Sequence, residues 1–223
     1  AAALGPGDRP ELHAEDTLAA GARHNDAAMV STLVRAAPGA VAWLAAQGVA
    51  FDRDGDGWAL GREGGHGRAR IVHAGGDASG HAVVAAMVQA VAGAAHVTRL
   101  PSHALCALAL SESGALAAVR LAGADGSTID VATPDLVLAT GGIGALFAAT
   151  TNPLSADGNG LALALEAGAP GRDLEFVQFH PTALAVPGEG PLPLLTEALR
   201  GAGAVLRNAR GEAVMDGLHP LAD

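Results

Sequence analysis

Apolar residues recur at helical spacing in three stretches of the chain. Residues 26–47 form an alanine-rich stretch that ends before Gly48, so we predict a long helix there. Pro38 lies inside this stretch and predicts either a kink or two separate helices. Residues 81–91 and 158–167 predict two shorter helices.

Short apolar runs bounded by turn residues predict strands. Three of them are separated by SESG and GADG turns and predict an antiparallel meander, at residues 104–110, 116–121 and 128–131. Isolated runs predict further strands at residues 49–51, 97–100, 136–139, 174–179 and 204–206. The DRDGDG segment at 52–57 predicts a turn, and its calcium-loop resemblance fails because no Glu follows at the required offset.

Charge and cysteine content exclude several classes of function. The net charge is −10 and all 13 basic side chains are Arg, which argues against a nucleic-acid-binding protein. The single cysteine, Cys106, excludes a disulfide framework and a thiolate metal site within one chain. Cys106 lies in an apolar run, so we predict a small core residue. A single cysteine fits a reducing compartment, and we predict a cytoplasmic protein. The scattered His residues predict no metal site, and the longest apolar run, 82–95, is too short for a membrane span.

Two glycine-rich turns are candidates for ligand contact. ATGG at 139–142 follows a predicted buried strand, where missing side chains let a ligand approach the backbone. Gly158 to Gly160 opens a predicted helix, whose free N–H groups favour an electron-rich ligand. Each turn has an ordinary structural alternative, a strand-ending turn for the first and a capped helix start for the second.

Polar residues interrupt two apolar segments, EFVQFHPTAL at 175–184 and LLTEALRGAG at 194–203. In a helical TEALRG turn, Thr196 and Arg200 share a face and Glu197 can pair with Arg200. A His, a Thr and an Arg that converge would bind a dicarboxylate. Taken singly, each is more often structural. A third segment, REGGH at 62–66, places Glu63 among glycines, where it would suit an ammonium group or lie in a plain surface loop.

Together these segments resemble the succinate dehydrogenase and fumarate reductase flavoprotein superfamily, and within it most closely the L-aspartate oxidases. QFHPT and TEALRG, in this order, are specific to the superfamily, and REGGH favours the aspartate oxidases. The matching segments lie at 13–22, 43–52, 62–80, 138–153, 174–184 and 194–204.

The resemblance implies an α/β fold, with residues 1–173 forming the central part of a FAD-binding Rossmann-like domain that includes the β-meander. Residues 174–223 would begin an α+β capping domain. The superfamily's G-x-G-x-x-G fingerprint is not found in the sequence, and its catalytic Arg would follow Asp223. We therefore expect an incomplete domain, in a poorly soluble fragment lacking both ends.

The resemblance also implies roles for individual residues. FAD would lie along His103, Ala104, Thr140, Gly141, Gly142, Gly158, Asn159 and Gly160. The catalytic site would comprise Glu63, Gln178, His180, Thr196, Glu197 and Arg200. In it, His180, Thr196 and Arg200 would hold the substrate carboxylates. Glu197 and Arg200 would relay protons, and Glu63 would bind the substrate amino group.

The implied reaction is oxidation of L-aspartate to iminoaspartate, with oxygen or fumarate reoxidising FAD, in the quinolinate branch of NAD biosynthesis. Quinolinate synthase is a possible partner of such an enzyme. Two alternatives stay open: a fumarate reductase or succinate dehydrogenase flavoprotein, and a non-catalytic truncated remnant. Three positions depart from the family pattern: Asn159 replaces an Asp, Ala202 a Glu, and Gly67 a more frequent Ser.

Overall fold

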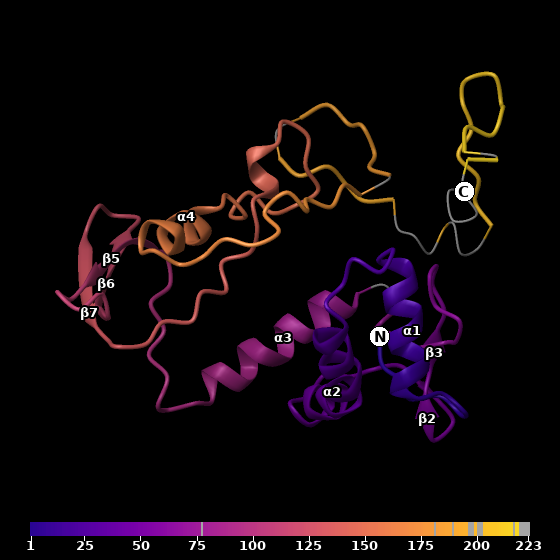
Figure 1. Cartoon of the computed structure of the whole chain (residues 1–223), viewed down its shortest axis with the longest axis horizontal. Coiled ribbons are helices and arrows are strands. Elements are labelled where there is room, and N and C mark those ends of the chain that lie inside the picture. Colours follow the sequence, from indigo (N-terminus) through magenta and orange to yellow (C-terminus); the bar gives the residue numbers. More distant parts are fainter. Residues whose placement is uncertain are drawn as a thin grey trace. The chain divides into compact units, whose positions relative to one another are not determined.

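The protein is described by a computed structural model. It covers residues 1–76, 78–180, 182–188, 190–195, 199, 203–215 and 217–218. The chain divides into two compact units (Figure 1), one of residues 1–98 with 197–223 and one of residues 99–196. The predicted domain boundary between residues 173 and 174 stays a prediction.

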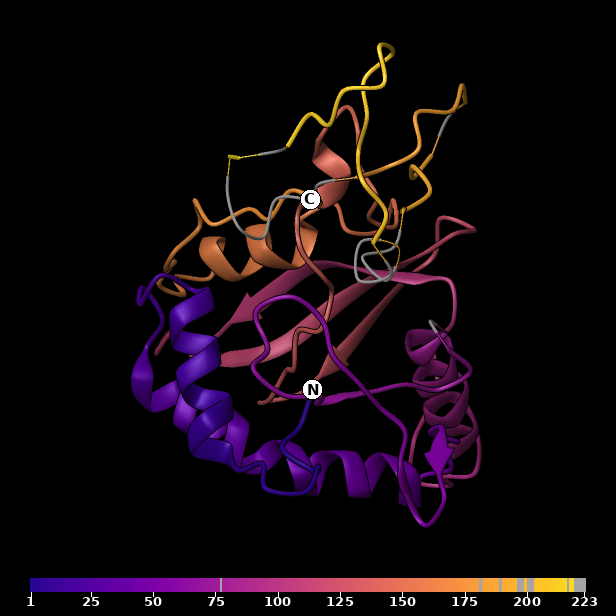
Figure 2. The same ribbon diagram turned by 90° about the vertical axis from the view of Figure 1, so that its right-hand side faces the viewer.

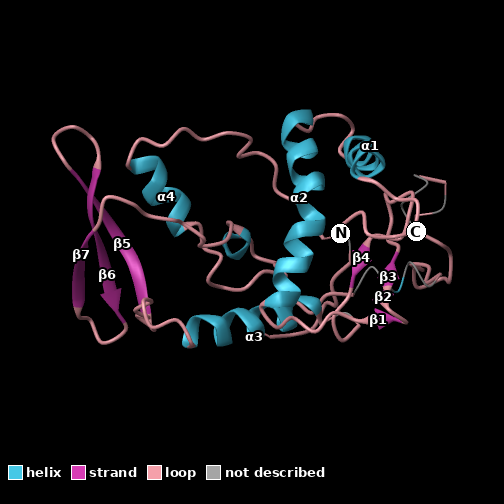
Figure 3. Ribbon diagram, turned by 90° about the horizontal axis from the view of Figure 1, so that it is seen from below, coloured by secondary structure: helices cyan, strands magenta, loops and turns pink. Residues whose placement is uncertain are grey.

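Two helices that contact each other make up much of the first unit. Helix α2 (Ala27–Ala46) begins where the Asp26 carboxylate accepts hydrogen bonds at 2.9 and 3.1 Å from backbone N–H groups of the first turn. It continues through Pro38, so the expectation of two separate helices was wrong. Helix α1 (Pro10–Ala20) lies beside α2 (Figure 3). We did not predict α1, because its apolar residues do not gather on one face.

Helix α2 is long and apolar enough to cross a membrane by length and composition. Such a helix is weak evidence for a membrane protein, because helices in protein cores have the same composition. Here Val30 and Val34 are buried within the unit. The prediction that the chain has no membrane span stays a prediction.

Two small hairpins and a third helix complete the described elements of the first unit. Strands β1 (Arg53–Asp54) and β2 (Gly57–Trp58) pair across the predicted turn, and β3 (Leu60–Gly61) pairs with β4 (Ile71–Val72). Helix α3 (Ser79–Ala92) confirms the helix predicted at 81–91. A small core joins Val49, Ala74 and Ala86.

The second unit is built around the predicted meander. Strands β5 (His103–Leu110), β6 (Leu116–Gly123) and β7 (Thr128–Ala132) form an antiparallel sheet in that order. Helix α4 (Asn159–Glu166) contacts β5, as Figures 1 and 2 show, and confirms the helix predicted at 158–167. The sheet therefore fixes the position of the turn that opens α4.

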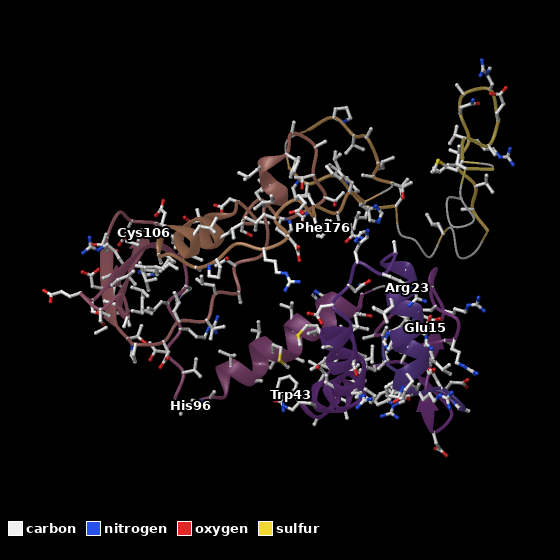
Figure 4. The ribbon with its side chains drawn as sticks, in the orientation of Figure 1. Glu15, Arg23, Trp43, His96, Cys106 and Phe176 are labelled. Carbon is white, nitrogen blue, oxygen red and sulfur yellow. The ribbon has the colours of Figure 1, made fainter. Side chains whose placement is uncertain are left out.

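The isolated apolar runs did not become strands. Residues 49–51, 97–100, 136–139, 174–179 and 204–206 form no strand. A strand requires a neighbouring ladder, and none of these runs is paired along its length; Val137, for example, is 90% exposed. Cys106 was also predicted wrongly: it is exposed on the sheet (Figure 4), because alternate side chains of β5 face solvent.

Candidate functional site

A cavity of about 630 Å³ lies within the second unit. One wall comes from the chain between Gly142 and Asn152, and the other from Phe176–His180 with Ala183, Leu192 and Leu194. Phe176, labelled in Figure 4, lines this second wall and is itself 69% exposed. The cavity thus brings the ATGG turn and the QFHPT segment together.

The two glycine turns predicted to contact a cofactor pack against each other. The N–H of Gly158 donates to the Gly142 oxygen at 3.2 Å. A β-carbon at Gly160 would lie 2.1 Å from Thr140 Oγ1, so only glycine allows this approach. Beside Gly142, which lines the cavity, a β-carbon would meet no atom within 4 Å. The turn therefore presents bare backbone to open space.

The start of α4 is held to the sheet by Asn159. Its side-chain amide donates to the Leu105 oxygen at 2.7 Å, next to the predicted cofactor residue Ala104. Its backbone N–H donates to Asp157. The N–H groups of Gly160 and Leu161 belong to the first helical turn and have no intrahelical acceptor, so they suit an electron-rich ligand. His103, the predicted cofactor residue before Ala104, has its Nδ1 2.8 Å from the Pro101 oxygen.

The imidazole of His180 is oriented by its own chain. Its Nδ1 lies 2.8 Å from the Thr182 oxygen and 3.2 Å from the Thr182 nitrogen. The shorter contact to a carbonyl, which can only accept, favours a proton on Nδ1. Nε2 is then left as an acceptor. His180 and Gln178 both line the cavity.

Backbone bonds fix the QFHPT segment against the opposite wall. The N–H of Leu192 donates to the Thr150 oxygen at 2.7 Å, and Ala183 forms a bridge with Leu194. Phe147 and Phe179 meet edge to face with ring centroids 5.7 Å apart. The cavity is therefore lined by aromatic rings and by polar side chains, among them Gln178 and His180.

Of the remaining predicted catalytic residues, the structure describes Glu63. Glu63 is exposed in the first unit, in the loop between β3 and β4. The Glu63 oxygen accepts from the His66 N–H at 3.3 Å, which closes a tight turn around the two glycines. Thr196, Glu197 and Arg200 lie outside the described residues, so their predicted roles stay predictions.

The family model described as an FAD binding domain matches residues 1–222. The chain belongs to this FAD-binding domain family. The match confirms the predicted cofactor and, with the structural likeness below, the predicted α/β FAD-binding fold.

Relatives of this FAD-binding chain include two L-aspartate oxidases. That of Caulobacter vibrioides is 46% identical over 221 residues, which cover 99% of this chain and 43% of the relative. That of Streptomyces coelicolor is 49% identical over 231 residues, covering 100% and 40%. The chain thus spans about two fifths of the length of these curated relatives.

Two solved structures are similar. A mutant of the E. coli quinol fumarate reductase FrdA matches with a TM-score of 0.87 and 29% identity, over 100% of this chain and 38% of that one. The Mycobacterium smegmatis Sdh1 complex matches with a TM-score of 0.81 and 32% identity, over 95% and 38%. The resemblance to the flavoprotein superfamily is confirmed by these matches.

The residues of the second unit fit a bound FAD. The bare Gly142 backbone, the paired glycine turns and the open N–H groups of α4 are features that an extended, electron-rich cofactor requires. The structure brings together Thr140–Gly142, Gly158–Gly160 and the start of β5. The assignment of these eight residues to FAD stays a proposal.

The sequence did not reveal two groups of residues, one that lines the cavity and one that lies near the Glu63 loop. Ile143 and Phe147 line the cavity but sit in an apolar run with no distinguishing pattern. In the first unit, Asp8, Asp16 and Arg70 form a buried ionic cluster. The sequence signal for this cluster is Arg70 of the RAR segment, which follows a glycine-rich loop. An Arg in such a place is ordinarily a surface residue, so the signal does not stand out.

Proposed function

We propose that this chain is the central part of an FAD-dependent L-aspartate oxidase, which converts L-aspartate to iminoaspartate in the cytoplasm. The observation that carries the proposal is 46% and 49% identity to L-aspartate oxidases along nearly the whole chain, against 29% to the fumarate reductase FrdA. The product would enter the quinolinate branch of NAD biosynthesis, with quinolinate synthase as a possible partner.

In this reaction the C2–H bond of aspartate breaks, its electron pair leaves the substrate, and the ammonium nitrogen loses protons as the C=N bond forms. FAD, when bound, supplies the two-electron acceptor, and oxygen or fumarate regenerates it. The protein must therefore hold both carboxylates, accept the ammonium group and exclude bulk water.

The described residues supply part of this site. His180 and the Gln178 amide would bind a substrate carboxylate in the cavity. Thr196 and Arg200 would hold carboxylate oxygens, and Glu197 with Arg200 would move protons. Glu63 would take the ammonium group.

Glu63→Gln tests the assignment, because a dicarboxylate without an amino group has no use for this carboxylate. In a full-length protein that contains this sequence, we expect the KM for L-aspartate to rise by about tenfold or more, while the inhibition constant of succinate stays nearly unchanged. Glu112→Gln, in an exposed turn of the second unit, is a matched control. Equal loss of both ligands would reject the role of Glu63.

The second candidate is a fumarate reductase or succinate dehydrogenase flavoprotein. Its support is the TM-score of 0.87 to the fumarate reductase FrdA over the whole chain. Reduction of the flavin by succinate in preference to L-aspartate would favour this candidate. A protein that binds FAD but is reduced by neither would favour a non-catalytic remnant.

A further inference from the structure

Arg70 is the centre of a buried ionic cluster in the first unit. Its side chain is 1% exposed, and it binds Asp8 through two hydrogen bonds, at 2.7 Å from Nε and 2.9 Å from Nη2. Its Nη1 donates to Asp16 on α1. The guanidinium is thus shared by two carboxylates, one of them fully buried, so its orientation is fixed.

Asp16 also binds the loop that carries Glu63. Its Oδ2 accepts from the Gly67 N–H at 2.7 Å. The base of this loop is closed by β3–β4 pairing and by a 2.9 Å bond from the Arg70 N–H to the Gly61 oxygen. Asp16 therefore connects α1, the buried cation and the far side of the loop.

Two histidines pack beside the cluster. The rings of His13 and His66 lie 5.7 Å apart, and the Nδ1 of each is buried without a hydrogen-bond partner among the described residues. Burial first, and then the charge of Arg70, lower the pKa of both rings. Because His66 also donates its backbone N–H to Glu63, its buried ring restricts the backbone of Glu63.

We propose that Asp16 and Arg70 are positioning residues for Glu63, and that they hold its loop so that the carboxylate meets the ammonium group of the substrate. This inference rests on the proposed function. The loop contains Gly64, Gly65 and Gly67, so ordering it costs more conformational entropy than ordering other residues would. The hydrogen bond from Gly67 to Asp16 offsets that cost, because no strand pairing holds this part of the loop.

The test compares Asp16→Asn with Asp130→Asn in a full-length protein that contains this sequence. Asp130 also pairs with an arginine, Arg120 at 2.7 Å, but at an exposed site. For Asp16→Asn we expect the KM for L-aspartate to rise about tenfold with a smaller change in kcat, and succinate inhibition to change less than about twofold. Amide hydrogen exchange at Gly67 should accelerate, which activity measurements alone do not report.

Gly67→Ala serves if Asp16→Asn fails to fold. Its new β-carbon would lie 3.1 Å from Asp16 Oδ2, so the exposed loop must shift slightly away from the carboxylate. We expect the same selective rise in the KM for L-aspartate, but smaller. Suppose that Glu63→Gln selectively raises the KM for L-aspartate. If Asp16→Asn and Gly67→Ala then leave this KM and the inhibition constant of succinate unchanged, or raise both equally, the positioning inference is overturned while the role of Glu63 stands. If Glu63→Gln is itself without effect on L-aspartate, the role of Glu63 falls and this inference falls with it.

Discussion

The side-chain amide of Asn159 donates a hydrogen bond to the main-chain oxygen of Leu105 over 2.7 Å. This bond joins the first residue of α4 to the third residue of β5, although the two are 54 positions apart in the sequence. The resemblance to the flavoprotein superfamily implies an Asp at this position, and an ionised carboxylate cannot donate to a carbonyl. Asn159 therefore makes a contact that an ionised Asp would not make.

Asn159→Asp should destabilise the second unit at neutral pH by about 1–2 kcal/mol, because a carboxylate would then face the Leu105 oxygen. Asn159→Ala, which removes the bond without adding charge, should cost less. The defect of Asn159→Asp should shrink as the pH falls and the new carboxyl gains a donor proton. Urea unfolding at several pH values measures this, and equal stability of the Asp and Asn proteins at neutral pH would refute it.

The elements that the sequence predicted well are those whose partners are close in the chain. The meander of β5, β6 and β7 is joined by short turns, so each strand pairs with its immediate neighbour. Helix α2 starts at the Asp26 cap. The runs at 136–139 and 174–179 have strand-like composition, but composition does not show whether a distant segment pairs with them.

The candidate site was predictable only in part for the same reason. Glycine turns have a recognisable spacing, so Thr140–Gly142 and Gly158–Gly160 could be proposed together before the structure showed their contact. The Arg70 cluster could not be proposed, because Asp8 and Arg70 are 62 positions apart. Charged residues are also surface residues by default, and only the fold buries these.

Removal of one partner from the Arg70 cluster should be costly. Arg70→Ala leaves the Asp8 carboxylate, 1% exposed, without its counter-charge, so the free energy of unfolding should fall by about 3–5 kcal/mol. Arg120→Ala breaks a bidentate pair with Asp130 that is more than half exposed, so stability should hardly change. Similar losses in the two variants by chemical denaturation would show that burial does not decide the cost.

The stability of the first unit should depend on the neutral state of His13 and His66. Burial, followed by the charge of Arg70, lowers the pKa of both rings below 6.5 in the folded state. The unfolded chain therefore binds protons first, and stability should decline as the pH falls below 6.5 until the folded-state pKa is reached.

His13→Leu should flatten that dependence, because one of the two buried titrating rings is gone.

The carboxylates affect stability at lower pH. Burial raises the pKa of Asp8, but hydrogen bonds and the charge of Arg70 outweigh burial and lower the pKa below 3.8. Their contribution is complete above pH 3.8 and declines below it. A stability profile that stays flat from neutral pH to about pH 5 would contradict the histidine account.

Gly142→Ala and Gly160→Ala should separate cofactor contact from folding. A β-carbon at Gly142 meets no protein atom within 4 Å but enters the cavity, so we expect near-normal stability and weaker FAD binding. A β-carbon at Gly160 would collide with Thr140, so stability should fall by about 1–3 kcal/mol. Gly80→Ala, in α3 with open space around it, is the control for both.

Flavin titrations and unfolding curves of the same preparations distinguish these effects. Unchanged FAD affinity in Gly142→Ala, with normal stability, would mean that the cofactor does not lie along this turn.

If this chain belongs to an enzyme whose FAD accepts electrons from L-aspartate, that amino acid should reduce the bound flavin. The most direct measurement is the absorbance of FAD in a full-length protein that contains this sequence, mixed without oxygen with L-aspartate or with succinate. We expect L-aspartate to bleach the flavin band much faster than succinate does, and fumarate or oxygen to restore it. Bleaching by succinate in preference, or by neither compound, would contradict it.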